Sequence, residues 1–137
     1  SPYCVLEGTI ITTDQREVKI EELNKNYTIN GNKILGVSKD FYIREEMVFI
    51  KKDAISENIP NKDLYITPNH QLTYKGKFVK AKWLVDNLEN VEFVKNDKGV
   101  PVYNVLLEKY TVYKANNLRI ESLALEHKEK TNQIIYF

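Results

Sequence analysis

The sequence has a single cysteine, only five glycines and four prolines among 137 residues, and no long apolar run. One cysteine cannot form an internal disulfide, so packing must stabilise the fold and any sulfur chemistry must involve Cys4. The apolar stretches are a few residues long, far below the ~20 residues that span a bilayer. The N-terminal residues also lack the basic region and apolar core of a signal peptide. We therefore expect no membrane segment, and the sequence indicates no cellular compartment.

The sequence also lacks an excess of charge of one sign. The chain carries 20 basic and 19 acidic side chains, for a formal net charge of +1. Because a phosphate-binding surface needs a basic excess, we expect no nucleic-acid partner. No spacing of cysteine, histidine and carboxylate residues is typical of a zinc site, and His127 lies in a charged run typical of a solvated surface. We expect neither a metal nor a cofactor.

The sequence does contain many short apolar and β-branched segments separated by turns, within a length that suits one domain. Residues 74–78 and 96–99 are typical of hairpin turns, and residues 81–88 of a short helix around Trp83. This pattern predicts an all-β fold, either a sandwich or a closed, strongly curved sheet. The expected strands are residues 8–13, 18–23, 33–37, 46–51, 64–67, 71–74, 91–95, 102–107, 110–114 and 118–120.

Three blocks occur in a distinctive order along the chain. Residues 4–23 begin with the cysteine of CVLEGTIITT and end with VKIEEL, and residues 67–70 read TPNH. Residues 102–108 (VYNVLLE) and 113–122 (YKANNLRIES) follow near the end. In this order the blocks resemble the Hint domain of the intein and hedgehog superfamily, in a non-splicing, intein-like branch. The resemblance spans almost the whole chain and implies an all-β, horseshoe-shaped Hint fold with one short helix.

The resemblance also divides the chain. Residues 1–3 are expected to be a remnant of an upstream polypeptide, with Tyr3 contributing the scissile carbonyl. Residues 4–125 would form the Hint domain. Residues 126–137 would be a charged C-terminal extension whose apolar end can add an edge strand.

The chemistry of these residue types supports the same activity. A cysteine sulfur lies next to the carbonyl of its own preceding peptide and can attack it through a five-membered ring, which gives a thioester on Cys4. The amide nitrogen leaves poorly until it is protonated, and His70 is the candidate that acts first as base and then as acid. Thr67 can orient the imidazole or donate a hydrogen bond to the developing oxyanion, and Asn69 can share this task. The expected activity is self-cleavage in cis, with a single turnover.

Each of these residues has a simpler interpretation. Cys4 can be a small buried residue with an inert thiol, and His70 a partly buried histidine in the turn after Pro68. Lys109 can favour a thiolate or oxyanion by its charge, or it can be a solvated strand residue. The whole domain can be a degenerate Hint fold that serves as a structural or interaction module, or a cysteine hydrolase acting on other molecules through a dyad of Cys4 and His70.

The C-terminal block departs from that of splicing inteins. These end in His-Asn, whose asparagine cyclises to release the downstream segment, whereas here Glu121 and Ser122 occupy that place. The resemblance therefore implies cleavage without splicing. The upstream polypeptide would be the substrate, and water or another small nucleophile such as a thiol, an amine or a sterol-like alcohol would accept the acyl group.

Overall fold

The computed structural model describes residues 2–126 and 133–137, and His127 falls outside this part of the chain. The described residues fold mostly into β-strands with one short α-helix, as the sequence predicts. The elements in chain order are β1 (Val5–Leu6), β2 (Ile10–Thr12), β3 (Glu17–Lys19), the 3-10 helix η1 (Ile20–Glu22), β4 (Thr28–Ile29), β5 (Asn32–Tyr42), β6 (Glu46–Ile50), β7 (Leu64–Ile66), β8 (Gln71–Tyr74), β9 (Lys77–Lys80), α1 (Ala81–Val85), β10 (Val91–Lys95), β11 (Val100–Leu107), β12 (Val112–Ala115), β13 (Leu118–Glu121), β14 (Leu123–Ala124) and β15 (Ile134–Tyr136).

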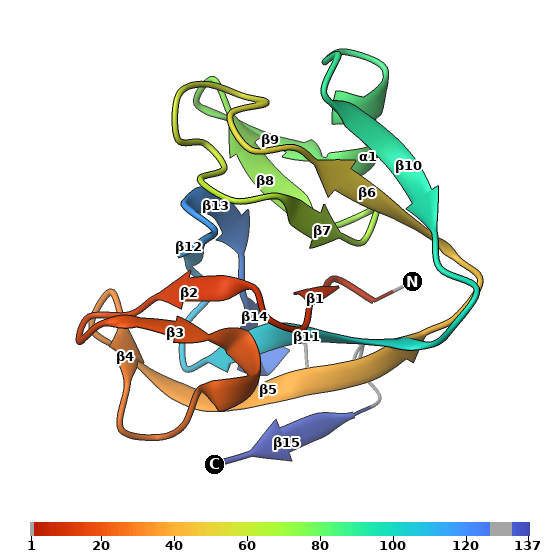
Figure 1. Ribbon diagram of the computed structural model, residues 1–137. Coiled ribbons are helices and arrows are strands. Elements are labelled where there is room, and N and C mark those ends of the chain that lie inside the picture. Colours follow the sequence, from red (N-terminus) through yellow and green to blue (C-terminus); the bar gives the residue numbers. More distant parts are fainter. Residues whose placement is uncertain (1, 127–132) are drawn as a thin grey trace.

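A long, bent, two-stranded ribbon gives the molecule its horseshoe shape (Figure 1). β5 pairs antiparallel with β11 in one lobe. In the other lobe, β6, which follows β5 in the chain, pairs antiparallel with β10, which precedes β11. The Arg44 amide donates a hydrogen bond of 3.0 Å to the Asn96 carbonyl at the bend. The hairpin expected at residues 96–99 is therefore wrong, because this turn carries the chain between lobes and β10 pairs with β6 instead of β11.

Two sheets organise the described residues. The larger has the order β10-β6-β7-β1-β11-β5-β15, with β14 beside β11 and β4 beside β5. The smaller has the order β3-β2-β12-β13-β8-β9. In the larger sheet β1 lies between β7 and β11. Cys4, which immediately precedes β1, therefore lies near the middle of this sheet.

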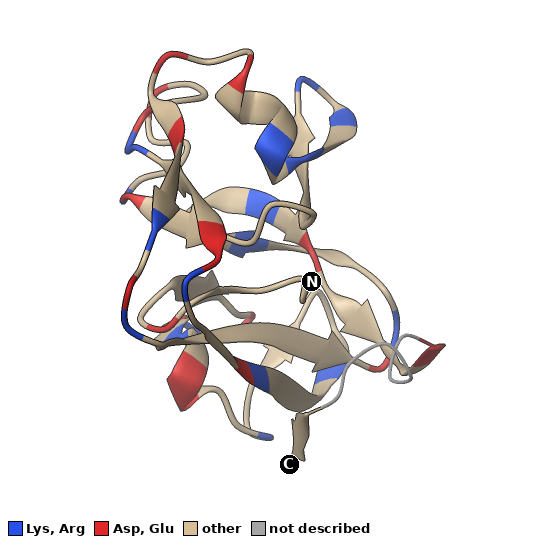
Figure 2. Ribbon diagram, turned by 90° about the vertical axis from the view of Figure 1, so that its right-hand side faces the viewer, with Lys and Arg blue, Asp and Glu red and all other residues tan. Residues whose placement is uncertain are grey.

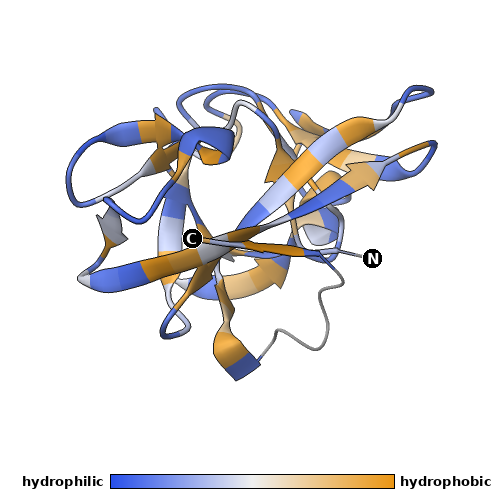
Figure 3. Ribbon diagram, turned by 90° about the horizontal axis from the view of Figure 1, so that it is seen from below, coloured by the Kyte–Doolittle hydropathy of each residue, from blue (hydrophilic) through white to orange (hydrophobic). Residues whose placement is uncertain are grey.

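The core follows from alternation along the strands. In β13, Leu118 and Ile120 are buried while Arg119 between them is exposed, as a strand with one inward face requires. Figure 3 shows this alternation of apolar and polar residues in strands of both lobes. Acidic and basic residues are interspersed over the outside (Figure 2), in keeping with the balanced charge of the sequence.

The helix α1 is shorter than expected. It ends at Val85 because the next residues close a turn, in which the Asn87 amide donates to the Leu84 carbonyl at 3.1 Å and the Asn87 side chain donates to the Trp83 carbonyl at 2.7 Å. An asparagine side chain that bonds nearby backbone in this way competes with helix continuation.

The C-terminal residues join the larger sheet. β14 runs parallel to β11, and β15 lies antiparallel along the edge of β5. Gly36 makes this second pairing possible, because a Cβ atom added there would clash with the backbone oxygen of Ile135. Within the described residues, no helix has the length and apolar character needed to cross a membrane.

Candidate functional site

Cys4 is held by its backbone against the end of β7. It is 1% exposed, and its amide nitrogen donates a hydrogen bond of 2.9 Å to Thr67 Oγ1. The Cys4 carbonyl oxygen accepts hydrogen bonds from the Thr67 amide at 2.9 Å and from the Thr67 hydroxyl at 3.2 Å. Thr67 therefore satisfies both backbone polar groups of Cys4. The preceding Tyr3 is 39% exposed, so the Tyr3-Cys4 peptide bond joins a solvated residue to a buried one.

His70 lies in the turn that follows β7. Its amide donates to the Thr67 carbonyl at 3.2 Å, and its ring is fully buried. Ring atom Nε2 lies 2.8 Å from the Glu121 carbonyl oxygen, and because a carbonyl only accepts, Nε2 carries the proton. Nδ1 then holds a lone pair, and it has no hydrogen-bond partner in the described part of the chain. Burial lowers the pKa of His70 to about 4, against the opposing effect of the Glu121 and Cys4 backbone.

The Cys4 thiol lies beside β5 of the larger sheet. Its Sγ atom is 3.7 Å from the Ser38 hydroxyl oxygen on β5. Burial raises the pKa of the thiol to about 12, while the hydrogen bond with Ser38 acts to lower it and the charge of Asp40 adds to the increase. The resting thiol is therefore protonated near neutral pH.

A buried hydrogen-bond network holds the Ser38 hydroxyl beside the sulfur. Ser38 Oγ accepts the hydrogen of the Asn104 backbone amide at 3.0 Å. The Asn104 side-chain oxygen Oδ1 in turn accepts the Tyr113 hydroxyl hydrogen at 2.7 Å. Burial raises the pKa of Tyr113 well above its ordinary value, and negative charge on Cys4 adds to this shift. Because Ser38 Oγ accepts from Asn104, its own hydrogen can point at the sulfur. Ser38 would then be the donor once the sulfur becomes a thiolate.

A small cavity of about 180 Å³ opens beside the peptide that precedes Cys4. The Asn69 side-chain oxygen is buried there without a hydrogen-bond partner among the described residues. This volume and these polar groups suit water or a small polar molecule. The cavity is lined by Tyr3, Asn69, Gln71, Lys80, Glu121, Ser122 and Leu123.

The structure thus gathers most of the residues that the sequence singles out. Cys4 and Thr67 are hydrogen-bonded, and the rings of Tyr3 and His70 have their centroids 6.3 Å apart. Within the described residues the Thr67 hydroxyl bonds to the Cys4 backbone, and no bond joins it to the Tyr3 carbonyl or to the imidazole. Lys109 is exposed in the bend between β11 and β12, without a side-chain hydrogen bond in this part of the chain.

Sequence reasoning did not identify Ser38, Asn104 or Tyr113 as part of this site. The available signal is a polar residue within an apolar strand, because Asn104 interrupts the run from Val102 to Leu107. For metal binding, the described residues contain no group of three or more histidine, cysteine or carboxylate side chains that could hold an ion.

Solved structures with a similar fold include a bacterial intein-like domain from Clostridium thermocellum, with a TM-score of 0.70 and 18% identity over 89% of this chain and 100% of that one. The AceL NrdHF class 3 split intein, in a splice-inactive variant, has a TM-score of 0.56 and 16% identity over 89% and 99% of the two chains. The DnaB intein from Synechocystis sp. PCC 6803 has a TM-score of 0.55 and 10% identity over 88% and 99%. A comparison with curated proteins gives no significant match.

The sequence model of the Hint domain matches residues 3–127, which is most of the chain. This match begins one residue before the buried cysteine and includes the turn that carries His70. The strand order, the bent ribbon and the similar solved structures agree with it. The chain therefore belongs to the Hint domain family.

Proposed function

We propose that this domain cleaves the peptide bond between Tyr3 and Cys4 by an N-to-S acyl shift. The Cys4 sulfur attacks the Tyr3 carbonyl carbon through a five-membered ring, the carbon-nitrogen bond breaks, and the Tyr3 acyl group becomes a thioester on Cys4. The observation that carries this proposal is the hydrogen bond from the Cys4 amide to Thr67 Oγ1, because this nitrogen is the leaving group. The same threonine fixes the Cys4 carbonyl, which limits rotation of the attacking residue.

His70 supplies the proton transfer. With Nε2 bonded to the Glu121 carbonyl, Nδ1 is free to take the thiol proton and then return it to the departing nitrogen. A neutral imidazole is required for the first step, and burial keeps the ring neutral. Asn69 is a candidate hydrogen-bonding group on the cavity side of the same peptide. Lys109, which is exposed, is assigned no step.

The acyl group then passes to water or to an external small nucleophile that enters the cavity beside Tyr3. Attack by water releases the upstream polypeptide with a carboxylate at Tyr3 and restores the Cys4 thiol. The first three residues are the end of the cleaved segment in this scheme, residues 4–125 the autoprocessing domain, and residues 126–137 its extension. Glu121 and Ser122 provide no side-chain amide for cyclisation, so no splicing follows.

A second function is a structural or interaction module that keeps the fold without cleaving. The burial of both reactive groups favours it, because the Cys4 pKa is raised to about 12 and the His70 pKa is lowered to about 4. A protonated thiol and a neutral imidazole are stable together. Cleavage must start from the small fraction of molecules whose Cys4 thiol has lost its proton. The reaction is therefore slow unless the Tyr3-Cys4 peptide bond is itself made more reactive.

The test is a fusion of a foreign reporter protein in front of Ser1. Incubation with hydroxylamine or a thiol should release the reporter with its new end at Tyr3, because both reagents trap a thioester. Intact mass identifies the end. Cys4→Ala and His70→Gln should abolish release, and Lys98→Gln, an exposed residue in the turn between β10 and β11, should cleave as the unmodified domain does.

The outcomes separate the two functions. Release at Tyr3 that depends on Cys4 supports the acyl shift. Release elsewhere, or equal release from Cys4→Ala, contradicts the mechanism. A folded domain that never releases the reporter, judged by a cooperative thermal transition, supports the structural module.

A further inference from the structure

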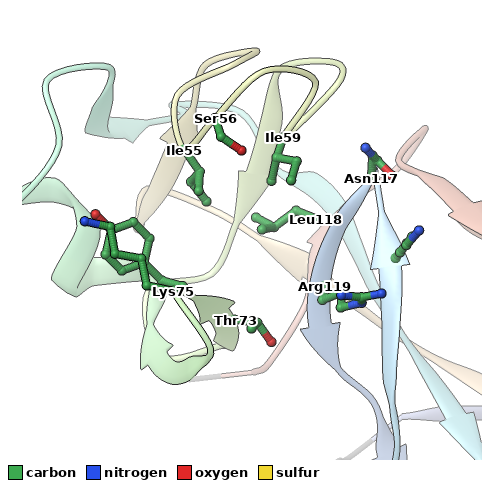
Figure 4. Close-up of a pocket in the computed structure, with 10 residues that line it drawn as sticks. Ile55, Ser56, Ile59, Thr73, Lys75, Asn117, Leu118 and Arg119 are labelled. Atoms are coloured by element: carbon green, nitrogen blue, oxygen red, sulfur yellow. The ribbon is translucent and has the colours of Figure 1, made fainter.

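A second cavity lies away from Cys4, between two hairpins and a loop. It has a volume of about 450 Å³, which is within the range of small-molecule sites. One wall is the β12-β13 hairpin, another is the turn between β8 and β9, and the loop at residues 55–59 covers it (Figure 4). None of the residues that line the cavity beside Tyr3 takes part.

Hydrogen bonds between the walls preform this cavity. The Asn117 side chain donates to the Asn58 carbonyl at 2.7 Å, and the Asn61 amide donates to the Asn116 carbonyl at 2.9 Å, so the loop is fastened to the β12-β13 hairpin. The Asp53 carboxylate accepts the Asn58 amide hydrogen at 2.7 Å and shapes the loop from within. A site held open in this way loses little free energy to ordering when a ligand binds.

The charge of the cavity is one-sided. Lys75, Lys114 and Arg119 line it, together with the hydroxyl groups of Ser56 and Thr73, and no carboxylate does. In the described part of the chain, Lys114 and Arg119 make no ion pair or side-chain hydrogen bond, and the Lys75 ammonium lies 5.4 Å from the centre of the Tyr74 ring. The acidic Glu57 belongs to the covering loop but lies outside the cavity lining.

Lys114 and Arg119 are also direct cross-strand partners on β12 and β13. Like charges directly opposite each other in an antiparallel pair destabilise the sheet. The hairpin therefore carries two neighbouring cations at the edge of this cavity, and the same pair also borders a separate cavity of about 250 Å³ beside Thr12 and Asn30. A bound anion would relieve their repulsion and accept hydrogen bonds from both, with the planar Arg119 guanidinium suited to a carboxylate or phosphate group.

The remaining surface of the cavity is mostly apolar, with Asn117 as its polar member. Figure 4 shows the side chains of Ile55, Ile59 and Leu118 gathered on one side of the cavity, with Thr73 across from them and Lys75 and Arg119 at opposite ends. An inorganic ion would leave this apolar surface uncovered. The combination fits a molecule with an anionic head and an apolar ring or chain.

We propose that this cavity, named here the hairpin cavity, binds a small organic anion, with Lys114 and Arg119 on its carboxylate or phosphate group and Ile55, Ile59 and Leu118 on its apolar part. The site does not depend on cleavage at Cys4. It lies at the far ends of β8 and β13 from His70 and Glu121, so the two sites share strands without sharing residues.

Binding is tested by amide chemical-shift titration of the full chain in parallel with phenyl phosphate, benzoate, inorganic phosphate and neutral benzyl alcohol. We expect saturable shifts confined to residues around the hairpin cavity with phenyl phosphate or benzoate, and the difference between these two identifies the head group. Arg119→Gln and Lys114→Gln should each weaken binding by about tenfold or more, because each removes a charge-assisted hydrogen bond. Lys98→Gln, another exposed cation outside the cavity, should bind normally.

Thermal unfolding of the same variants separates a binding role from a structural one. Because removing one cation ends the cross-strand repulsion, Arg119→Gln should unfold at the same temperature or higher while losing the ligand. The proposal is overturned if no organic anion gives saturable shifts, if benzyl alcohol or inorganic phosphate binds as tightly, or if the Arg119 and Lys114 variants bind normally.

Discussion

The Cys4 amide donates its hydrogen to the hydroxyl oxygen of Thr67, 63 positions further along the chain and 2.9 Å away. This contact joins the start of β1 to the end of β7, and the carbonyl of Cys4 accepts two hydrogen bonds from the same threonine. In the proposed acyl shift, one side chain therefore holds both the leaving nitrogen and the attacking residue. Its effect on cleavage can be measured separately from its effect on folding.

We expect Thr67→Ala to slow cleavage of the reporter fusion by roughly 10²- to 10³-fold, the cost of removing one positioned hydrogen-bonding group from a reacting centre. Thr67→Ser keeps the hydroxyl and should restore most of the rate. Single-turnover kinetics by gel densitometry measure both, and a thermal melt checks folding. A Thr67→Ala domain that cleaves at the unmodified rate would remove this residue from the reaction.

Acid should destabilise the fold through His70. Its folded-state pKa of about 4 lies below the ordinary 6.5, so the unfolded chain binds more protons between these values and stability is lost as pH falls through this window. The shift corresponds to roughly 3 kcal/mol in the free energy of unfolding. Urea unfolding between pH 7 and pH 4.5 measures it.

The matched variant for this experiment is His70→Gln, which should show a smaller dependence on pH over the same window. If that variant does not fold, a proton NMR titration of the unmodified domain decides the matter instead. The His70 ring signals should stay constant from pH 7 down to pH 5. A midpoint near 6.5 for the His70 ring would contradict the prediction.

The pH dependence of cleavage should report on the proton transfer between the buried thiol and His70. In the proposed shift His70 takes the thiol proton and returns it to the leaving nitrogen, so no proton is exchanged with solvent. The rate of thioester formation should therefore change little between pH 6 and pH 10, which lies above the His70 pKa of about 4 and below the Cys4 pKa of about 12. Ser38→Ala removes the hydroxyl beside the sulfur and should slow cleavage at every pH in this range, whereas Ser38→Thr should largely retain the rate. Identical profiles for Ser38→Ala and the unmodified domain would show that the contact has no role in thiolate formation.

A fusion with distinguishable proteins on both sides of the chain should yield one free upstream protein and a domain still attached to its downstream partner. Succinimide formation needs a side-chain amide nitrogen, which neither Glu121 nor Ser122 has. Mass spectrometry distinguishes the products. A joined product that lacks residues 4–137 would show that splicing occurs by a route these residues do not indicate.

Much of the fold could be predicted from the sequence because it depends on local pattern. The strands at residues 71–74 and 91–95 have the predicted limits, and the turn between β8 and β9 has Lys75 and Gly76 in the left-handed conformation that such hairpins need. The length of β5 was missed. Its second half contains Ser38, Lys39 and Asp40, which look like loop residues until their pairing with distant β11 is known.

Part of the candidate site could likewise be predicted from the sequence, and part could not. Cys4, Thr67 and His70 lie in short motifs, so their residue types and order were enough to single them out. Ser38 lies in no motif, and its contact with Cys4 exists only because β1, β11 and β5 are neighbours in one sheet. The role of Glu121 was likewise hidden, because it is the backbone carbonyl, which every residue has, that fixes the His70 ring.

Two described segments after Ser122, β14 and β15, pair within the same sheet as β1, the strand that follows Cys4. Leu123 and Ala124 are buried in β14 beside β11, and β15 is seated along β5 where Gly36 leaves room for it. Cutting the backbone after Ser122 would therefore leave the downstream part anchored non-covalently, and it could depart only by stripping two strands from the sheet. In this fold β14 and β15, downstream of Ser122, are paired within the larger sheet, whereas Tyr3, upstream of Cys4, lies in no strand.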